Sequence, residues 1–215
     1  MAYPSIIGRN EEIKKLEKFL NSSKSEFVAV YGRRRVGKSY LIEEVYKEHI
    51  VFRAIGAYIR DKDEKSYRQT QLDHFYESLL DCGLSDETPR PTNWHEAFRL
   101  LKKYLEGLPS HRRVVFLDEL PWLAGPQSSE MITELGYFWN SWADRQRNIV
   151  LVVCGSATSW MLDNVIRDYG SLHGRLTGTI RLLTLTANER KTAHSHHQPQ
   201  LLLERHSSQW QYSTN

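Results

Sequence analysis

Residues 32–39, GRRRVGKS, contain the residue types that bind a chain of phosphates. Gly32, Gly37, Lys38 and Ser39 match the spacing G-x-x-x-x-G-K-S/T. A loop that wraps a phosphate must point successive backbone N–H groups inward, and glycine permits the dihedral angles and close approach that this requires. Lys38 would bring a cation to the outer phosphates, and the Ser39 hydroxyl would ligate Mg²⁺. The spacing therefore predicts a loop that binds nucleotide phosphates.

Three arginines occupy the variable positions of this loop. We expect most of them to face solvent, and the alternatives are added charge beside the phosphates or contact with a partner. The apolar run before the loop and the helical pattern after it are the context that the motif needs, because a helix directs its N-terminal amides at the phosphates. The residues predicted to contact the nucleotide here are Gly32, Arg33, Arg34, Arg35, Val36, Gly37, Lys38, Ser39 and Tyr40.

A second, weaker candidate precedes the first predicted helix. Gly8 and Arg9 follow two isoleucines in IIGRNEE. A glycine that allows close approach beside apolar residues would suit the flat face of a nucleotide base. A plain turn is the alternative interpretation.

Two acids stand at the end of an apolar run, VVFLDE. In a parallel sheet the carboxyl end of a strand faces the ligand crevice. We expect Asp118 to hold Mg²⁺ through a water and Glu119 to activate the water that attacks the nucleotide. Acids in this position can also cap a helix. Their place after the phosphate loop, with a strand between, favours the metal and base roles.

Two further polar residues lie beside later predicted strands. Ser156 ends the apolar run VVCGS, where it could hydrogen-bond the attacking water or the terminal phosphate. Its alternative role is the N-cap of the following helix. Arg175 precedes the last predicted strand and could neutralise charge on the transferred phosphoryl group, from a neighbouring subunit, or form a surface salt bridge.

Strands and helices alternate along the chain. Asn10 is the expected N-cap of the first helix. The apolar periodicity predicts helices over residues 11–20, 38–48, 64–81, 93–107 and 130–145, and strands within residues 27–32, 50–58, 112–120, 148–156 and 178–186. Such alternation favours an α/β fold with a parallel sheet covered by helices on both faces.

Composition limits the classes of protein. The chain has 215 residues, 40% of them hydrophobic, and a net charge of +3, which suits one globular domain with an appendage and does not argue for a nucleic-acid partner. Two distant cysteines, Cys82 and Cys154, provide no disulfide framework. No signal peptide or membrane-spanning run is visible, so we expect a cytoplasmic protein without a membrane partner.

The final stretch differs from the rest. We predict one domain over residues 1–188 and a low-complexity, disordered tail over residues 189–215, which has no sustained period. Its HSHH run lacks the fixed geometry of a metal site, so we assign no metal ligand there.

Together, the segments IIGRNEEIKKL, VYGRRRVGKS, VVFLDELPWLA, LVVCGSATSWM and GRLTGTIRLLTLT carry a family likeness. The chain resembles the archaeal and bacterial AAA+-like, STAND-related P-loop ATPases, whose members often carry a C-terminal nuclease-like domain. The resemblance implies a P-loop NTPase fold with a five-stranded sheet in the order 5-1-4-3-2. It also implies Mg²⁺-dependent binding and hydrolysis of ATP. Residues 32–39 would be the Walker A loop, Asp118 and Glu119 the Walker B pair, and Ser156 the first sensor.

The functional expectation is an ATPase that acts as a switch or motor module, in a homo-oligomer or with a protein partner. DNA binding is implied only by family analogy. The likeness stops after Asn188, which motivates the hypothesis of a truncated or frame-shifted product lacking the helical lid. The alternative is therefore a nucleotide-binding module with negligible turnover. The acidic pair disfavours a small-molecule kinase, and the absence of an Asn-Lys-x-Asp tetrad disfavours a GTPase.

Overall fold

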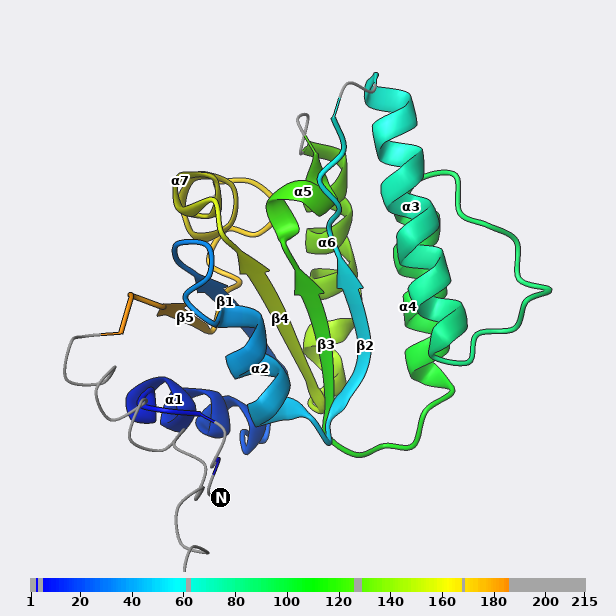
Figure 1. The fold of residues 1–215 in the computed structure, drawn as a ribbon. Coiled ribbons are helices and arrows are strands. Elements are labelled where there is room, and N and C mark those ends of the chain that lie inside the picture. The colour runs from blue at the N-terminus through cyan, green and yellow to red at the C-terminus, as the bar shows by residue number, and fades with distance from the viewer. Residues whose placement is uncertain (1–2, 4–5, 61–62, 126–128, 168, 186–215) are drawn as a thin grey trace, which may run out of the picture. The chain divides into compact units, whose positions relative to one another are not determined.

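Five parallel strands form the centre of the fold, in the order β2-β3-β4-β1-β5 (Figure 1). This confirms the predicted order, read from the opposite edge. The computed structural model describes residues 3, 6–60, 63–125, 129–167 and 169–185. The strands are β1 (Glu26–Tyr31), β2 (Ile50–Ile55), β3 (Arg113–Asp118), β4 (Ile149–Gly155) and β5 (Gly178–Arg181).

The apolar content of each strand matches its place in the sheet. The central strands β3 and β4 are buried along their whole length, and β1 is buried except at its last residue, which is half-buried. The edge strands β2 and β5 are only partly buried. Strands of a parallel sheet covered on both faces need continuous apolar sequence, which VVFL and IVLVVC provide.

Helices follow the strands and cover both faces of the sheet. They are α1 (Asn10–Leu20), α2 (Lys38–Tyr46), α3 (Glu64–Asp81), α4 (Trp94–Glu106), α5 (Leu120–Ala124), α6 (Ser129–Ser141) and α7 (Thr158–Met161), with the short turns η1 (Ala143–Gln146) and η2 (Leu162–Ile166). Among the described residues, none of these helices has the length and apolar character to cross a bilayer.

Two apolar clusters make up the core. On one face, α1 and α2 pack against alternate residues of the strands, including Val30, Phe116 and Cys154. On the other face, α3, α4, α5 and α6 cover the intervening residues, with Phe75 and Trp94 in edge-to-face contact at 5.6 Å. Figure 1 shows α1 and α2 on one side of the sheet and α3, α4 and α6 on the other. The predicted three-layer arrangement is confirmed.

Some boundaries differ from the sequence prediction. Asn10 is the first helical residue and not the N-cap; the cap is Arg9, whose φ of 63° is left-handed and whose side chain makes no capping bond. The helix predicted over 130–145 ends at Ser141, and a 3₁₀ turn follows. The strand predicted within 178–186 ends at Arg181, because β1, its described neighbour, ends at Tyr31. The tail predicted for 189–215 lies outside the described residues.

Candidate functional site

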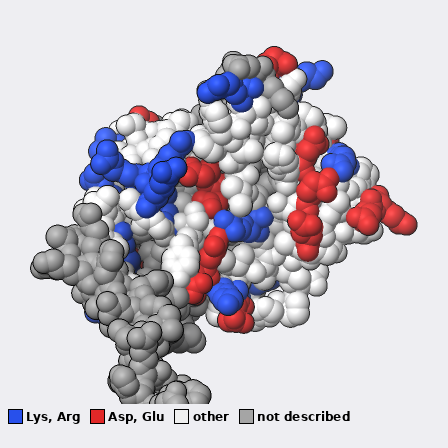
Figure 2. Space-filling view, viewed as in Figure 1, with Lys and Arg blue, Asp and Glu red and all other residues white. Residues whose placement is uncertain are grey.

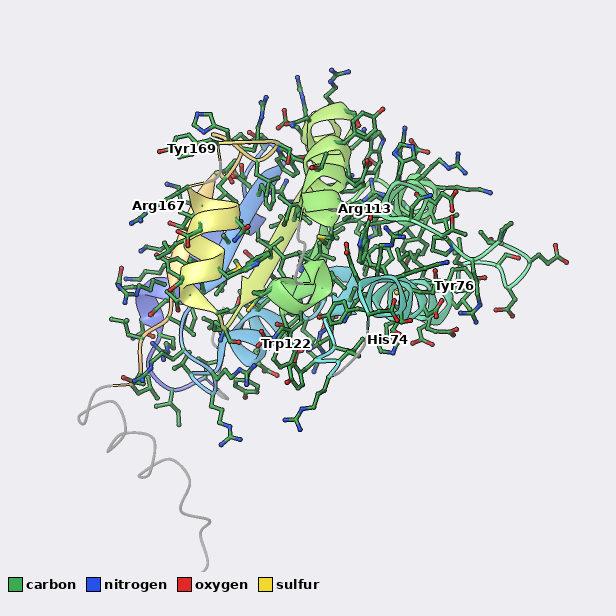
Figure 3. The ribbon with its side chains drawn as sticks, turned by 90° about the horizontal axis from the view of Figure 1, so that it is seen from above. His74, Tyr76, Arg113, Trp122, Arg167 and Tyr169 are labelled. Atoms are coloured by element: carbon green, nitrogen blue, oxygen red, sulfur yellow. The ribbon has the colours of Figure 1, made fainter. Side chains whose placement is uncertain are left out.

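Most of the predicted site residues lie at or just after the carboxyl ends of three neighbouring strands. Tyr31 of β1 pairs with Gly155 of β4, and Leu117 of β3 pairs with Val153 of β4. Because β4 lies between β1 and β3, the segments that follow these strands emerge at one edge of the sheet. Figure 3 looks onto the molecule from above, from the side toward which these strands point in Figure 1.

The loop between β1 and α2 has the conformation that its glycines permit. Gly32 has a φ of 150°, and a Cβ built on it would lie 2.2 Å from the carbonyl oxygen of Leu182. Gly37 has a φ of 87° at the N-terminus of α2, and no neighbouring atom lies within 4 Å of a Cβ built on it. The strand, loop and helix expected around the phosphate motif are therefore present.

Lys38 is held inside this loop. Its side chain is buried, with 5% of the residue exposed. Its Nζ donates a hydrogen bond to the carbonyl oxygen of Arg33 at 2.9 Å. Ser39 follows in the first turn of α2 and is half-buried. The cation thus faces the interior curve of the loop, where the predicted phosphates would bind.

Asp118 is almost fully buried at the end of β3 and both of its oxygens have donors. One oxygen accepts the backbone N–H of Glu119 at 2.9 Å. The other lies 3.2 Å from Nη2 of Arg53, whose Nη1 lies 2.5 Å from Oε1 of Glu43. Arg53 therefore connects the helix that follows the phosphate loop to the strand that carries the acids.

Arg53 was missed by the sequence reasoning. The only signal is a charged residue inside the apolar run IVFRAI of an edge strand. Arg53 pairs with Phe116 in the β2–β3 register, two residues before the Ile55–Asp118 pair. Side chains two residues apart in a strand share a face, so Arg53 and Asp118 are neighbours through the sheet and not through the sequence.

Glu119 and Ser156 contact each other directly. Oε2 of Glu119 accepts hydrogen bonds from the hydroxyl of Ser156 at 2.9 Å and from its backbone N–H at 3.3 Å. The alternative role of Ser156 as a helix cap is wrong: the N-cap of α7 is Ala157, and no side chain caps it. The left-handed φ of 47° at Glu119 turns the chain from β3 into α5.

Arg34 connects the loop to this pair. Its Nε lies 3.4 Å from the hydroxyl oxygen of Ser156, and its guanidinium carbon lies 4.6 Å from the ring centre of Trp122. All three loop arginines are exposed. Figure 2 shows basic side chains gathered over this part of the molecule. Exposure was expected, but the contact of Arg34 with Ser156 and Trp122 was not.

A buried thiol lies beside the acids. Burial raises the pKa of Cys154 well above its usual range, and the charge of Asp118 raises it further, against an opposing effect of Lys38. The thiol is therefore a neutral neighbour of the predicted site. Cys154 is also part of the apolar core.

Arg9, which follows Gly8, contacts the phosphate loop through its side chain. Both residues have left-handed φ values, 71° and 63°. Nη2 of Arg9 donates to the carbonyl oxygens of Val36, at 3.3 Å, and Leu183, at 2.5 Å. Arg9 therefore ties the phosphate loop to the segment after β5. The expected contact of Gly8 with a base stays a prediction.

Arg175 and Tyr40 are two further predicted residues, and both are exposed. Arg175 is exposed in the turn before β5, where its backbone N–H donates to the Leu172 carbonyl at 3.0 Å. Tyr40 is 46% exposed on α2. The roles predicted for both stay predictions.

The donors present fit a magnesium ion that is shared with a nucleotide. Asp118 offers a carboxylate and Ser39 a hydroxyl, both hard oxygen ligands. Mg²⁺ commonly takes only one or two protein ligands and completes its shell with waters and phosphate oxygens. The described residues contain no cluster of three or more His, Cys, Asp or Glu side chains that could hold a metal.

Comparison with known proteins identifies a family. The family described as an ATPase domain predominantly from Archaea matches residues 6–195. A protein of Methanocaldococcus jannaschii described as uncharacterized is 27% identical over 183 residues, which are 83% of this chain and 36% of that protein. An uncharacterized ATP-binding protein of the same organism is 40% identical over 48 residues, 22% of this chain and 81% of that protein.

Solved structures share the fold. The Walker-type ATPase PaBY2304 of Pyrococcus abyssi has a TM-score of 0.58 and 23% identity, over 86% of this chain and 55% of its own. Cdc6p of Pyrobaculum aerophilum also has a TM-score of 0.58, with 14% identity, over 91% of this chain and 50% of its own. The chain thus spans only part of the length of the relatives it matches.

Proposed function

This chain belongs to the family of ATPase domains found predominantly in Archaea, and we propose that it binds ATP together with Mg²⁺ and hydrolyses it. The observation that carries the proposal is the chain of contacts from Arg34 through Ser156 to Glu119. It links the phosphate loop after β1 to the predicted base after β3 and the predicted sensor after β4. In the proposed reaction these three groups surround one terminal phosphate.

Binding depends on the loop. The backbone N–H groups of residues 32–38 and the N-terminus of α2 hold the phosphates. Lys38 exchanges its hydrogen bond with the Arg33 carbonyl for the outer phosphates. Ser39 and Asp118 would hold the metal, which would supply positive charge to neutralise the phosphate oxygens. The ion pair between Arg53 and Asp118 orients the carboxylate before the metal arrives.

Hydrolysis depends on Glu119. The oxygen of a water attacks the terminal phosphorus, and Glu119 takes a proton from that water. The bond between the terminal phosphorus and the bridging oxygen breaks, and the electron pair leaves with ADP. Ser156 holds Glu119 through the hydroxyl and the backbone N–H, so the carboxylate has a defined position when the water enters.

The direct test of binding compares the wild type with Lys38→Ala in titration calorimetry with ATP, with and without Mg²⁺. We expect the variant to lose most of its affinity, because the buried cation is removed from the loop. Equal affinities in the two proteins would contradict the proposed site. As a control, Lys14→Ala removes an exposed cation that pairs with Glu11 on α1, and its affinity should match the wild type.

The test of turnover compares steady-state phosphate release by the wild type and by Glu119→Gln. We expect the variant to bind ATP but to release phosphate at least about 100-fold more slowly, the usual range for loss of a general base. Equal rates above the assay floor would contradict the role of Glu119.

The alternative is a nucleotide-binding module with negligible turnover, and one observation favours it. Both oxygens of Asp118 already have donors in the free protein, so the metal must compete with Arg53. Rates of wild type and Glu119→Gln that both stay at the assay floor, with normal ATP binding, would support this module. The further roles that we propose, a switch or motor part in a homo-oligomer or with a protein partner, rest on family likeness.

A further inference from the structure

Arg34 lies between the phosphate loop and the pair formed by Ser156 and Glu119. Its backbone belongs to the loop, and its Nε lies 3.4 Å from the hydroxyl oxygen of Ser156. That hydroxyl donates to Glu119 at 2.9 Å. If Glu119 activates water, the reacting oxygen lies within hydrogen-bond reach of Glu119. The Arg34 guanidinium is therefore one side chain away from the point of attack.

Trp122 gives the guanidinium a fixed support. The indole is half-buried on α5, and Figure 3 labels it beside that helix. Its backbone N–H donates to the Glu119 carbonyl at 2.9 Å, and its own carbonyl accepts the hydroxyl of Tyr67 at 2.6 Å. The ring centre of Tyr58 lies 5.2 Å away. The guanidinium carbon of Arg34 lies 4.6 Å from the Trp122 ring centre. Arg34 therefore packs on a residue whose backbone is fixed by hydrogen bonds at both its N–H and its carbonyl.

Other arginines lack this arrangement. The side chains of Arg33 and Arg35 make no described contact with Ser156, Glu119 or Trp122, although they belong to the same loop. Arg175, predicted to act from a neighbouring subunit, is exposed before β5. Arg34 is thus the loop arginine, among the described residues, whose position joins the phosphate loop to the predicted base and sensor.

We propose that Arg34 is a catalytic residue of ATP hydrolysis that acts within its own chain, resting on Trp122 and donating to the terminal phosphoryl group in the transition state. This inference rests on the proposed function and extends it. As water attacks and the bond to the bridging oxygen breaks, negative charge grows on the phosphoryl and leaving oxygens. Arg34 stays protonated and neutralises that charge, while Glu119 takes the proton of the water. A guanidinium offers five N–H donors, so it can hold Ser156 and a phosphoryl oxygen together.

The expected contribution of Arg34 to kcat follows from the negative charge that its guanidinium would neutralise in the transition state. An arginine that stabilises the transition state of phosphoryl transfer contributes about 10³- to 10⁵-fold to kcat. Arg34 is exposed and therefore screened by solvent, so we expect the lower part of this range or somewhat less, about 100- to 1000-fold. Because the residue acts within one chain, the rate per chain should not depend on protein concentration.

The experiment uses the full chain as wild type, Arg34→Ala, Arg34→Lys and the control Arg60→Ala. Arg60 is an exposed arginine past β2 that the proposed mechanism does not use. The first readout is kcat and KM for phosphate release over a range of protein concentrations. The second is a binding readout: the affinity for ADP and for ADP with aluminium fluoride, a mimic of the transition state, measured by calorimetry.

We expect Arg34→Ala to lower kcat about 100-fold or more with little change in KM. It should weaken the binding of ADP with aluminium fluoride by a similar factor while ADP binding stays within about 3-fold, because the charge is needed only in the transition state. Arg34→Lys should recover only part of the loss, and Arg60→Ala should behave as wild type.

Four outcomes would overturn the inference. Arg34→Ala could release phosphate at the wild-type rate, or lose affinity for ADP and for the mimic by the same factor. The rate per chain could instead rise with protein concentration and depend on Arg175, which would assign the cation to a neighbouring subunit. A wild type that binds ATP but releases no phosphate would overturn the hydrolytic function itself and this inference with it. The other outcomes leave phosphate release by the wild type intact, so failure of this inference can be distinguished from failure of the proposed function.

Discussion

The ion pair between Arg53 and Asp118 allows the sharpest test of how this site is built. The Arg53→Met change removes the cation but keeps much of the side chain's apolar stem. The Asp118 side chain is 5% exposed and that of Arg53 is 35% exposed, with 3.2 Å between Oδ2 and Nη2. At an effective dielectric constant of about 20, two unit charges 4 Å apart interact by about 4 kcal/mol. Partial exposure of Arg53 reduces this through solvent screening, and we expect a coupling of about 1–3 kcal/mol.

The assay is a double-mutant cycle read by urea unfolding. It compares the wild type, Arg53→Met, Asp118→Asn and the double variant. The coupling energy is the part of the loss that the two single changes share, so it excludes the apolar contacts of each side chain. We expect each single variant to lose free energy of unfolding and the double variant to lose less than their sum.

A matched cycle on Arg68 and Glu130 is the control. These side chains lie 3.0 Å apart, but 41% and 36% of them are exposed. Exposed ion pairs contribute about 0–1 kcal/mol. If the Arg53–Asp118 coupling were no larger than this control, burial of the carboxylate would not be what makes the pair matter. The reasoning that Arg53 orients Asp118 would then be refuted.

Three more changes have expected outcomes. Gly32→Ala places a Cβ 2.2 Å from the Leu182 carbonyl oxygen, so we expect lower stability in urea and weaker ATP binding in calorimetry; wild-type values for both would contradict the geometry of the loop. Asn93→Ala removes the side chain that caps α4 by accepting the Glu96 N–H, and should cost about 1 kcal/mol of unfolding free energy; no loss would mean that water replaces the cap. Hydrogen bonds from the backbone and hydroxyl of Thr92 lower the pKa of Glu96, so its stabilisation is present above the unfolded-state pKa and is lost as the pH falls through the folded-state pKa. Glu96→Gln should therefore be less stable than wild type at neutral pH, and the difference should shrink below about pH 4; a constant difference would contradict this.

The family and the architecture were accessible from the sequence because their signals are local. A phosphate loop needs glycines, a lysine and a hydroxyl at fixed spacing, between an apolar run and a helix, and the chain has them in Gly32, Gly37, Lys38 and Ser39. The archaeal ATPase family and the sheet order are confirmed. The relation to STAND proteins, the nuclease-like domain of relatives and the division at residue 188 stay predictions.

Errors arose where local signals were ambiguous. Asn10 is a residue type that favours an N-cap, yet the left-handed backbone at Arg9 starts the helix one residue earlier. Arg9 keeps that conformation while its guanidinium bonds to carbonyls of the phosphate loop and of the segment after β5. These are contacts between segments far apart in the sequence, which no local pattern contains.

The sequence by itself determined the residue types of this site and the strands that deliver them, because spacing and apolar periodicity are properties of short segments. Only the tertiary structure decided which side chains meet: Arg53 with Asp118 across β2 and β3, and Arg34 with Trp122 and Ser156 across the strand ends. The physical reason is that a parallel sheet aligns the ends of strands far apart in the chain. Its register and the rotamers of the side chains then set distances of a few ångströms, which spacing along the chain does not encode.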